Sequence, residues 1–195
     1  MSKTSETPEL PSLQELEEEL KRVRYKKSYH TMLRSTLGVL VVVAALAVLV
    51  ATLWLPVLQT NGTSMTPTLG DGEIILSVKT NAFETGDIVS FYYNNKILVK
   101  RIIAGPGDWV NMDTDGNVYV NDVLLDEPYL EEKSLGDCNI ELPFQVPDER
   151  YFVLGDHRSV SKDSRTTAIG CVSEEQMVGK IVFILWPFSH FGPVS

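Results

Sequence analysis

The sequence predicts a mainly β protein, in which a small antiparallel β-sheet domain follows a single N-terminal transmembrane helix. Two observations lead to this fold class. The 195-residue chain contains one long uncharged apolar run, residues 37–58. After this run, short segments rich in β-branched and aromatic residues alternate with turn-forming residues. The length leaves room for a tail, one membrane segment and one domain of ordinary size.

The apolar run LGVLVVVAALAVLVATLWLPVL contains 22 residues and no charged side chain. At about 1.5 Å per residue, a helix of this length can cross a hydrocarbon core of about 30 Å. Pro56 stands where such a helix should end. A cleaved signal peptide fits less well, because the run is longer than a signal peptide's apolar region and 36 residues precede it. We therefore expect an anchor in the lipid bilayer.

The charges before the run predict its orientation. Residues 21–34 carry six Lys or Arg and no acidic residue, and basic residues remain on the cytosolic side of a membrane. The prediction is a cytosolic tail (1–36), an anchor (37–58) and an extracytoplasmic domain (59–195) in a single-pass membrane protein. Within the tail, the acidic-then-basic stretch 13–27 is interpreted as a solvated charge run rather than as a short surface helix.

Seven segments of the domain have the composition of strands. They are residues 73–78, 87–93, 96–104, 109–112, 117–125, 151–155 and 180–188. The stretches YYNNK and DTDGNVYV have the residues of tight hairpin turns. Residues 126–148 are predicted to be an irregular insertion, and SEEQMVG, which begins at Ser173, is predicted to contain one short capped helical turn.

Charge and cysteine content exclude some classes of protein. After Gln59 the chain has 10 Lys or Arg against 20 Asp or Glu, a net charge of −10. Such an acidic domain argues against nucleic acid as a partner, because phosphate binding needs a basic face. The sequence contains no CxxC or Cys/His spacing typical of a metal site, so we expect neither a metal nor a cofactor. Cys138 and Cys171 leave a disulfide and two buried thiols as alternatives.

A serine and a lysine are the candidate reactive residues. Ser64 follows the apolar run closely, and a serine hydroxyl needs a base to become a nucleophile. Lys100 lies among apolar residues in KILVKRIIA, where burial disfavours the charged ammonium form and favours a neutral base. Each feature alone is weak, because a serine here is usually part of a turn and a lysine beside Arg101 usually marks a solvated strand edge.

Four motifs in one order make the combination specific. They are SMTPTL (64–69), GDIVSF (86–91), KRIIAGPGD (100–108) and GDHRSVSKDSR (155–165). This set resembles the bacterial type I signal peptidases, membrane-bound Ser-Lys endopeptidases that remove leader peptides from exported proteins. The resemblance covers roughly residues 37–190, and the single anchor and compact length resemble the form common in Gram-positive bacteria.

The resemblance implies a role for each matching residue. Ser64 corresponds to the nucleophile and Lys100 to the general base. Ser161 corresponds to the serine whose hydroxyl orients the lysine amine. Asp163 and Arg165 correspond to a structural ion pair that supports the site.

Further expectations concern the oxyanion and the substrate. The backbone N–H of Ser64 is the expected oxyanion donor. A second donor is expected near Gly62, which stands where some family members have a serine. The resemblance implies preprotein substrates with small residues at the first and third positions before the cut, and it leaves association with the secretion translocon open. The residues expected to line the substrate pockets are Thr60, Met65, Leu69, Leu98 and Val99.

Some alternatives remain open in the sequence. The family usually has Asn at the position of His157, so a Ser64–His157–Asp156 triad competes with a His157 that only replaces the hydrogen bonds of Asn. The triad is disfavoured, because relatives with a histidine base carry it at the Lys100 position. Two alternative functions remain: an inactive homologue that acts as a binding scaffold, and a self-cleaving Ser-Lys protease related to the SOS repressors. The latter is disfavoured because the sequence has no DNA-binding region.

Overall fold

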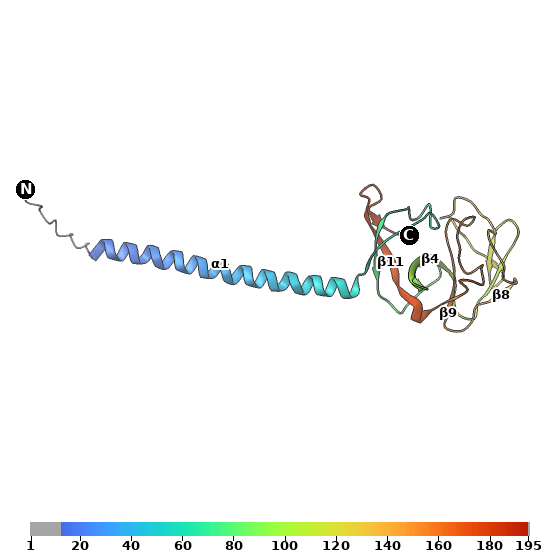
Figure 1. Cartoon of the computed structure of the whole chain (residues 1–195), viewed down its shortest axis with the longest axis horizontal. Coiled ribbons are helices and arrows are strands. Elements are labelled where there is room, and N and C mark those ends of the chain that lie inside the picture. Colours follow the sequence, from blue (N-terminus) through green and yellow to red (C-terminus); the bar gives the residue numbers. More distant parts are fainter. Residues whose placement is uncertain (1–12, 195) are drawn as a thin grey trace, which may run out of the picture. The chain divides into compact units, whose positions relative to one another are not determined.

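A computed structural model describes residues 13–194, and the chain divides into two units at Val50–Ala51. Helix α1, Leu13–Trp54, provides the first unit and ends within the second (Figure 1). The stretch 13–27 is helical, so its interpretation as a solvated charge run rather than a helix was wrong. The reason is local, because good helix formers and acidic residues that precede basic ones favour a helix.

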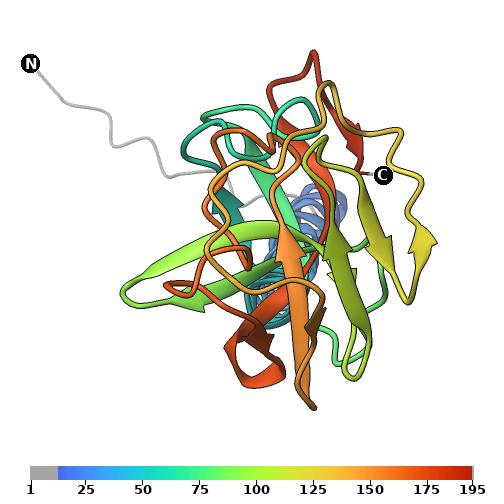
Figure 2. The same cartoon turned by 90° about the vertical axis from the view of Figure 1, so that its right-hand side faces the viewer.

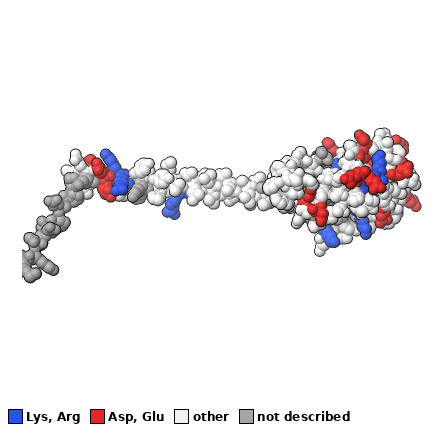
Figure 3. All heavy atoms as spheres, turned by 90° about the horizontal axis from the view of Figure 1, so that it is seen from above, with Lys and Arg blue, Asp and Glu red and all other residues white. Residues whose placement is uncertain are grey.

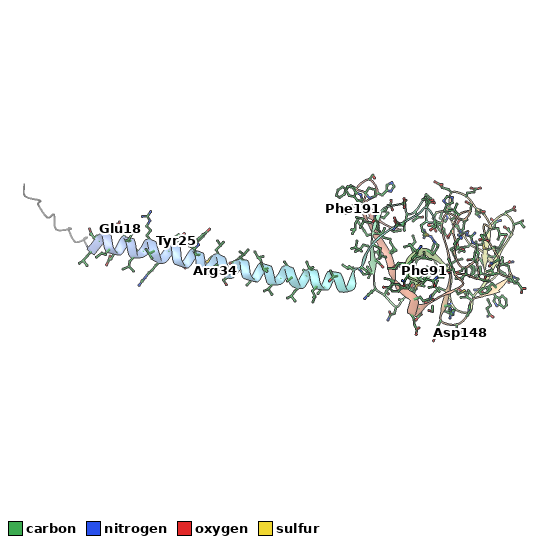
Figure 4. All side chains as sticks on the ribbon, in the orientation of Figure 1. Glu18, Tyr25, Arg34, Phe91, Asp148 and Phe191 are labelled. Atoms are coloured by element: carbon green, nitrogen blue, oxygen red, sulfur yellow. The ribbon has the colours of Figure 1, made fainter. Side chains whose placement is uncertain are left out.

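The apolar part of α1 is long enough to span a bilayer. The candidate span is Leu16–Val50, with a mean hydropathy of 2.4 in its most apolar window. Figure 3 shows Lys, Arg, Asp and Glu on the first part of the helix and on the β unit, and uncharged atoms along the stretch that follows Arg34, which Figure 4 labels. The helix ends at Trp54, two residues before Pro56, so the final residues of the predicted 37–58 segment are not helical.

Antiparallel strands build the second unit, as predicted (Figure 2). The larger sheet has the order β1-β2-β11-β3-β4-β9-β10, with β12 paired to β11, and the smaller one has the order β7-β6-β5-β8. The strands are β1 Val57–Gln59, β2 Ile74–Val78, β3 Ile88–Tyr93, β4 Lys96–Ala104, β5 Trp109–Met112, β6 Val118–Val120, β7 Val123–Leu124, β8 Phe144–Gln145, β9 Arg150–Leu154, β10 Val172–Ser173, β11 Met177–Trp186 and β12 Gly192–Pro193.

Most predicted strands are present, with two differences. The segment 117–125 is not a single strand, because Asn121 and Asp122 have φ values of 52° and 64° and turn the chain between β6 and β7. Asn and Asp tolerate this left-handed conformation better than most residues, which is how two short strands can form a hairpin here. The strand β8 also lies within 126–148, which was predicted to be irregular.

The short helical turn after Ser173 is confirmed as a 3-10 helix, Glu174–Gln176. Its N-terminus is capped from within, because the side-chain Oε1 of Gln176 accepts a hydrogen bond of 3.0 Å from the backbone N–H of Ser173. The turn leads directly into β11, which crosses the centre of the larger sheet.

Apolar side chains pack on both faces of the larger sheet. One cluster contains Phe91, which is 1% exposed and lies within the β unit, whereas Phe191 lies at its surface (Figure 4). A second cluster joins Met65 and Leu69 to strands β2, β3 and β11. Since Met65 and Leu69 directly follow the candidate nucleophile Ser64 in the chain, this second cluster holds the nucleophile loop against the sheet.

The two cysteines are free thiols, which decides between the alternatives left by the sequence. Burial raises the pKa of the Cys171 thiol to about 11. A thiol with such a pKa stays protonated near neutral pH and is a poor nucleophile. Cys138 is only partly buried.

Candidate active site

The candidate nucleophile lies in a loop between β1 and β2 that is closed by its own hydrogen bonds. The Thr60 hydroxyl donates to the Gly70 carbonyl over 2.6 Å, and the Gly72 N–H donates to the Thr60 carbonyl over 3.0 Å. Met65 and Leu69 are buried beneath the loop, while Ser64 is partly exposed. The loop therefore presents the Ser64 side chain on a well-supported backbone.

The Lys100 amine reaches this serine from strand β4. Its Nζ donates a 2.7 Å hydrogen bond to Ser64 Oγ and a 3.0 Å hydrogen bond to the Val99 carbonyl. Lys100 is 3% exposed. The two residues are 36 positions apart in the sequence, and the β3–β4 hairpin brings the lysine to the loop.

Burial lowers the pKa of Lys100 from 10.5 to about 8. Removal of water from the ammonium group is the largest cause, and the Arg165 charge acts in the same direction. The carboxylates of Asp163 and Asp156 oppose the shift. Near pH 8 a substantial fraction of the amine is neutral, and a neutral amine accepts the Ser64 proton instead of donating to the oxygen.

The loop 155–165 packs against the nucleophile loop at a glycine. A Cβ on Gly155 would lie 2.5 Å from the Ser64 carbonyl oxygen and 2.2 Å from Ser161 Oγ, so no larger residue fits without movement. The Gly155 N–H donates to Asp163 Oδ2 over 3.0 Å. This contact connects the close approach at Ser64 to the buried carboxylate behind it.

Asp163 and Arg165 form a fully buried ion pair. Arg165 Nε and one of its terminal nitrogens donate to the two Asp163 oxygens, each over 2.8 Å, and both side chains are 0% exposed. Arg165 also donates to the carbonyls of Leu135 and Arg158, over 2.7 and 2.9 Å. The guanidinium thus ties the loop 155–165 together and to the preceding insertion.

Two further buried ion pairs support the same loop, and sequence reasoning did not find them. Arg101 donates to both oxygens of Asp156 over 3.0 and 2.8 Å and lies 3.9 Å from the centre of the Tyr129 ring. Arg158 pairs with Glu127. The expected alternation along β4, which turns Arg101 away from Lys100, was a usable signal for the first pair. Glu127 lies in the irregular insertion, where the sequence has no comparable signal.

Ser161 is close to the site but does not make the expected contact. It is 2% exposed, and its Oγ has no hydrogen-bond partner within residues 13–194. The hydrogen bond to the Lys100 amine that the resemblance implies is therefore not formed in this structure. The carbonyl and N–H of Ser161 are engaged, with Arg165 and with the His157 carbonyl respectively.

The two expected oxyanion donors differ in availability. In the described part of the chain, no group accepts a hydrogen bond from the Ser64 N–H. The Gly62 N–H instead donates to Asp71 Oδ1 over 2.7 Å. Gly62 has a φ of 91°, a conformation that favours glycine. Of these two donors, only the Ser64 N–H can bind an oxyanion without breaking a hydrogen bond formed within residues 13–194.

A pocket opens beside Ser64 and Lys100. Its lining includes all five residues predicted for the substrate pockets, Thr60, Met65, Leu69, Leu98 and Val99, together with Gln59, Asn61, Gly62 and Ile97. Its volume is about 90 Å³, smaller than the roughly 150 Å³ cavity that accommodates benzene. A pocket of this volume suits a small side chain better than an aromatic one.

His157 does not form the alternative triad. Its ring Nδ1 is 2.9 Å from Thr66 Oγ1 and 3.2 Å from the Thr63 carbonyl oxygen, and among residues 13–194 the Ser64 hydroxyl is bonded to Lys100. Asp156, the third member of that triad, is paired with Arg101. Among the described side chains, no group of three His, Cys, Asp or Glu residues could hold a metal ion.

Comparisons with known proteins find related sequences and structures. Residues 33–186 match the family described as "Signal peptidase, peptidase S26". "Signal peptidase IB" of Staphylococcus aureus is 44% identical over 152 residues, which cover 67% of this chain and 78% of that protein. "Signal peptidase I" of Bacillus licheniformis is 36% identical over 164 residues, which cover 77% and 87%. A crystal structure of a signal peptidase I from Enterococcus faecalis V583 is 30% identical, with a TM-score of 0.42, and covers 51% of this chain and 96% of that one.

Proposed function

The chain belongs to the signal peptidase family, peptidase S26, and is a serine endopeptidase that removes signal peptides from preproteins; within it, we propose that Ser64 is the nucleophile and Lys100 the general base. The observation that carries the proposal is the 2.7 Å hydrogen bond between Ser64 Oγ and an amine that is 3% exposed. A buried amine with a lowered pKa and a hydroxyl in contact with it have the geometry of an activated nucleophile.

The proposed reaction uses one proton carrier. The neutral Lys100 amine takes the Ser64 proton while Oγ attacks the carbonyl carbon of the scissile peptide bond. The resulting ammonium returns that proton to the leaving amine as the C–N bond breaks, and the signal peptide remains as an ester on Ser64. Lys100 then takes a proton from a water molecule as the water oxygen attacks the ester, and the ammonium returns that proton to Ser64 Oγ as the ester C–O bond breaks, which releases the signal peptide and restores the serine and the neutral amine. Backbone N–H donation from Ser64 stabilises the negative oxygen in both steps.

The first prediction concerns pH. Because the base must be neutral, and burial lowers the pKa of Lys100 to about 8, kcat/KM should rise about tenfold per pH unit below pH 8 and level off above it. Purified full-length chain in detergent, with a preprotein substrate assayed from pH 6 to 10, measures this profile. N-terminal sequencing of the product identifies the cleaved bond. A kcat/KM that is constant between pH 6 and 9 would contradict a lysine base.

We also assign the pocket beside the dyad to the small residues that precede the cut. Its size supports this assignment, because a larger side chain would meet the walls formed by Leu98, Met65 and the other lining residues. Met65 and Leu69 are buried in the apolar cluster behind the pocket. Because that cluster is closely packed, these two side chains cannot easily move aside for a larger substrate side chain.

The second prediction concerns this selectivity. Leu98→Ala removes part of a half-buried wall, so kcat/KM for a preprotein with Val in place of Ala immediately before the cut should rise about tenfold relative to the Ala substrate. Val123→Ala, at a 69% exposed position in the other sheet, is the matched control and should leave the ratio unchanged. An unaltered ratio in Leu98→Ala would remove Leu98 from the specificity pocket.

The single N-terminal apolar helix is consistent with the membrane anchor of a signal peptidase. We extend the proposal to its topology, with residues 1–36 in the cytosol, the anchor from residue 37 to the end of α1 at Trp54, and the catalytic strands from Val57 onward outside. The basic stretch 21–34 supports this orientation. Confinement to the bilayer that holds the signal peptide raises the effective concentration of the cleavage site. Association with the translocon would do the same, and crosslinking in intact membranes tests it.

A further inference from the structure

His157 contacts the backbone on both sides of the nucleophile. Its backbone N–H donates to the Ser64 carbonyl over 3.1 Å. Its ring Nδ1 lies 3.2 Å from the Thr63 carbonyl oxygen and 2.9 Å from Thr66 Oγ1. The residue therefore contacts the peptide unit before Ser64 with its side chain and the peptide unit after Ser64 with its main chain.

The hydrogen bonds around the ring determine which nitrogen carries the proton. The Thr63 carbonyl oxygen can only accept a hydrogen bond, so its 3.2 Å contact with the ring requires a hydrogen on Nδ1 of His157. With Nδ1 as a donor, the Thr66 hydroxyl accepts from the ring over 2.9 Å and donates to the Thr63 carbonyl over 2.9 Å.

The direction of the Ser64 N–H follows from this contact. A peptide unit is planar and trans, so its C=O and N–H point in opposite directions and turn together. The Thr63 carbonyl accepts from the Thr66 N–H (3.2 Å), the Thr66 hydroxyl and the His157 ring. These three donors hold the Thr63–Ser64 peptide plane, and they leave the Ser64 N–H free of any acceptor in residues 13–194.

We propose that His157 is a positioning residue for the oxyanion site: its Nδ1–H holds the Thr63 carbonyl and thereby aims the Ser64 N–H at the transition-state oxygen. The proposal rests on the assignment of Ser64 as the nucleophile. His157 touches neither Ser64 Oγ nor Lys100 Nζ through any hydrogen bond among the described residues. It consequently acts through the backbone and leaves the base unchanged.

The test compares His157→Ala, His157→Asn and His157→Asp with Ser159→Ala, an exposed neighbour, as the matched control. Asn carries its amide nitrogen on Cγ, as His carries Nδ1, so it can donate to Thr63. Asp offers only acceptors at neutral pH. We expect kcat to fall about tenfold in His157→Ala and at least as far in His157→Asp, less than the roughly 10²–10³-fold of a deleted oxyanion donor. His157→Asn should retain most of the activity.

Three readouts separate this role from a merely structural one. In His157→Ala, KM and the midpoint of the pH profile should match the wild type, because neither ground-state binding nor Lys100 is altered. A peptide aldehyde, which forms a tetrahedral adduct with serine, should lose affinity in parallel with kcat. Nitrogen chemical shifts should show the Nδ1–H tautomer in the neutral ring.

The outcomes distinguish this inference from the function on which it rests. Activity in Ser64→Ala would overturn the nucleophile assignment. An inactive Ser64→Ala together with an unchanged kcat in His157→Ala would overturn only the role of His157. Equal losses in His157→Ala and His157→Asn would also overturn it, because donation to Thr63 would then not be the property that matters.

Discussion

Replacing Lys100 by methionine is expected to abolish preprotein cleavage, with kcat/KM reduced on the order of 10⁴-fold or more. Methionine keeps an unbranched side chain in the buried space but has no nitrogen to accept the Ser64 proton. The 2.7 Å hydrogen bond is the contact that the substitution removes. Cleavage is measured with a preprotein at pH 9, where the wild-type amine is mostly neutral.

The same substitution should not destabilise the fold near neutral pH. Below about pH 8 the amine is charged in both the folded and the unfolded chain, and the folded chain carries the cost of its burial. A pKa that falls from 10.5 to about 8 corresponds to about 3 kcal/mol of such cost. Between these two values the unfolded chain binds more protons, so wild-type stability should rise with pH there.

The control for Lys100→Met is Lys96→Met, at an exposed position of the same strand. It should leave both kcat/KM and Tm near the wild-type values. Cleavage by Lys100→Met at more than a tenth of the wild-type rate would contradict the assigned base. An inactive variant with a strongly lowered Tm would instead indicate loss of structure.

Breaking the Asp163–Arg165 pair should have the largest effect on stability. In Arg165→Met the Asp163 carboxylate would remain fully buried without its cation, and such a loss typically costs about 3–5 kcal/mol. The substitution also leaves the carbonyls of Leu135 and Arg158 without their donor. Urea unfolding of the full-length chain in detergent, followed by fluorescence, measures the difference.

Lys162→Met is the matched control, because Lys162 directly precedes Asp163 in the chain but is exposed. It should change the free energy of unfolding by less than about 0.5 kcal/mol. The double variant Asp163→Asn, Arg165→Met removes the unpaired buried charge of Asp163. It should therefore be less destabilised than the single Arg165→Met variant. A loss below about 1 kcal/mol in Arg165→Met would mean that water or another residue satisfies the carboxylate.

Local sequence properties account for most of the fold. The uncharged run ending near Pro56 and the β-branched segments act through neighbours a few residues away, which is why the apolar part of α1 and the long strands β3, β4 and β11 were predictable. Strands of two or three residues, such as β8 and β10, have no such pattern and exist only because a partner strand lies beside them.

The sequence by itself determined the class of protein and named Ser64 and Lys100, because four motifs in a fixed order carry that information. Only the tertiary structure decided how these residues are surrounded: Arg158 is paired with Glu127, the Gly62 N–H is already occupied, and Ser161 Oγ has no partner in residues 13–194. Burial, the pKa of an amine and the direction of an N–H all depend on atoms distant in the chain. Those atoms meet only when strands and loops pack together.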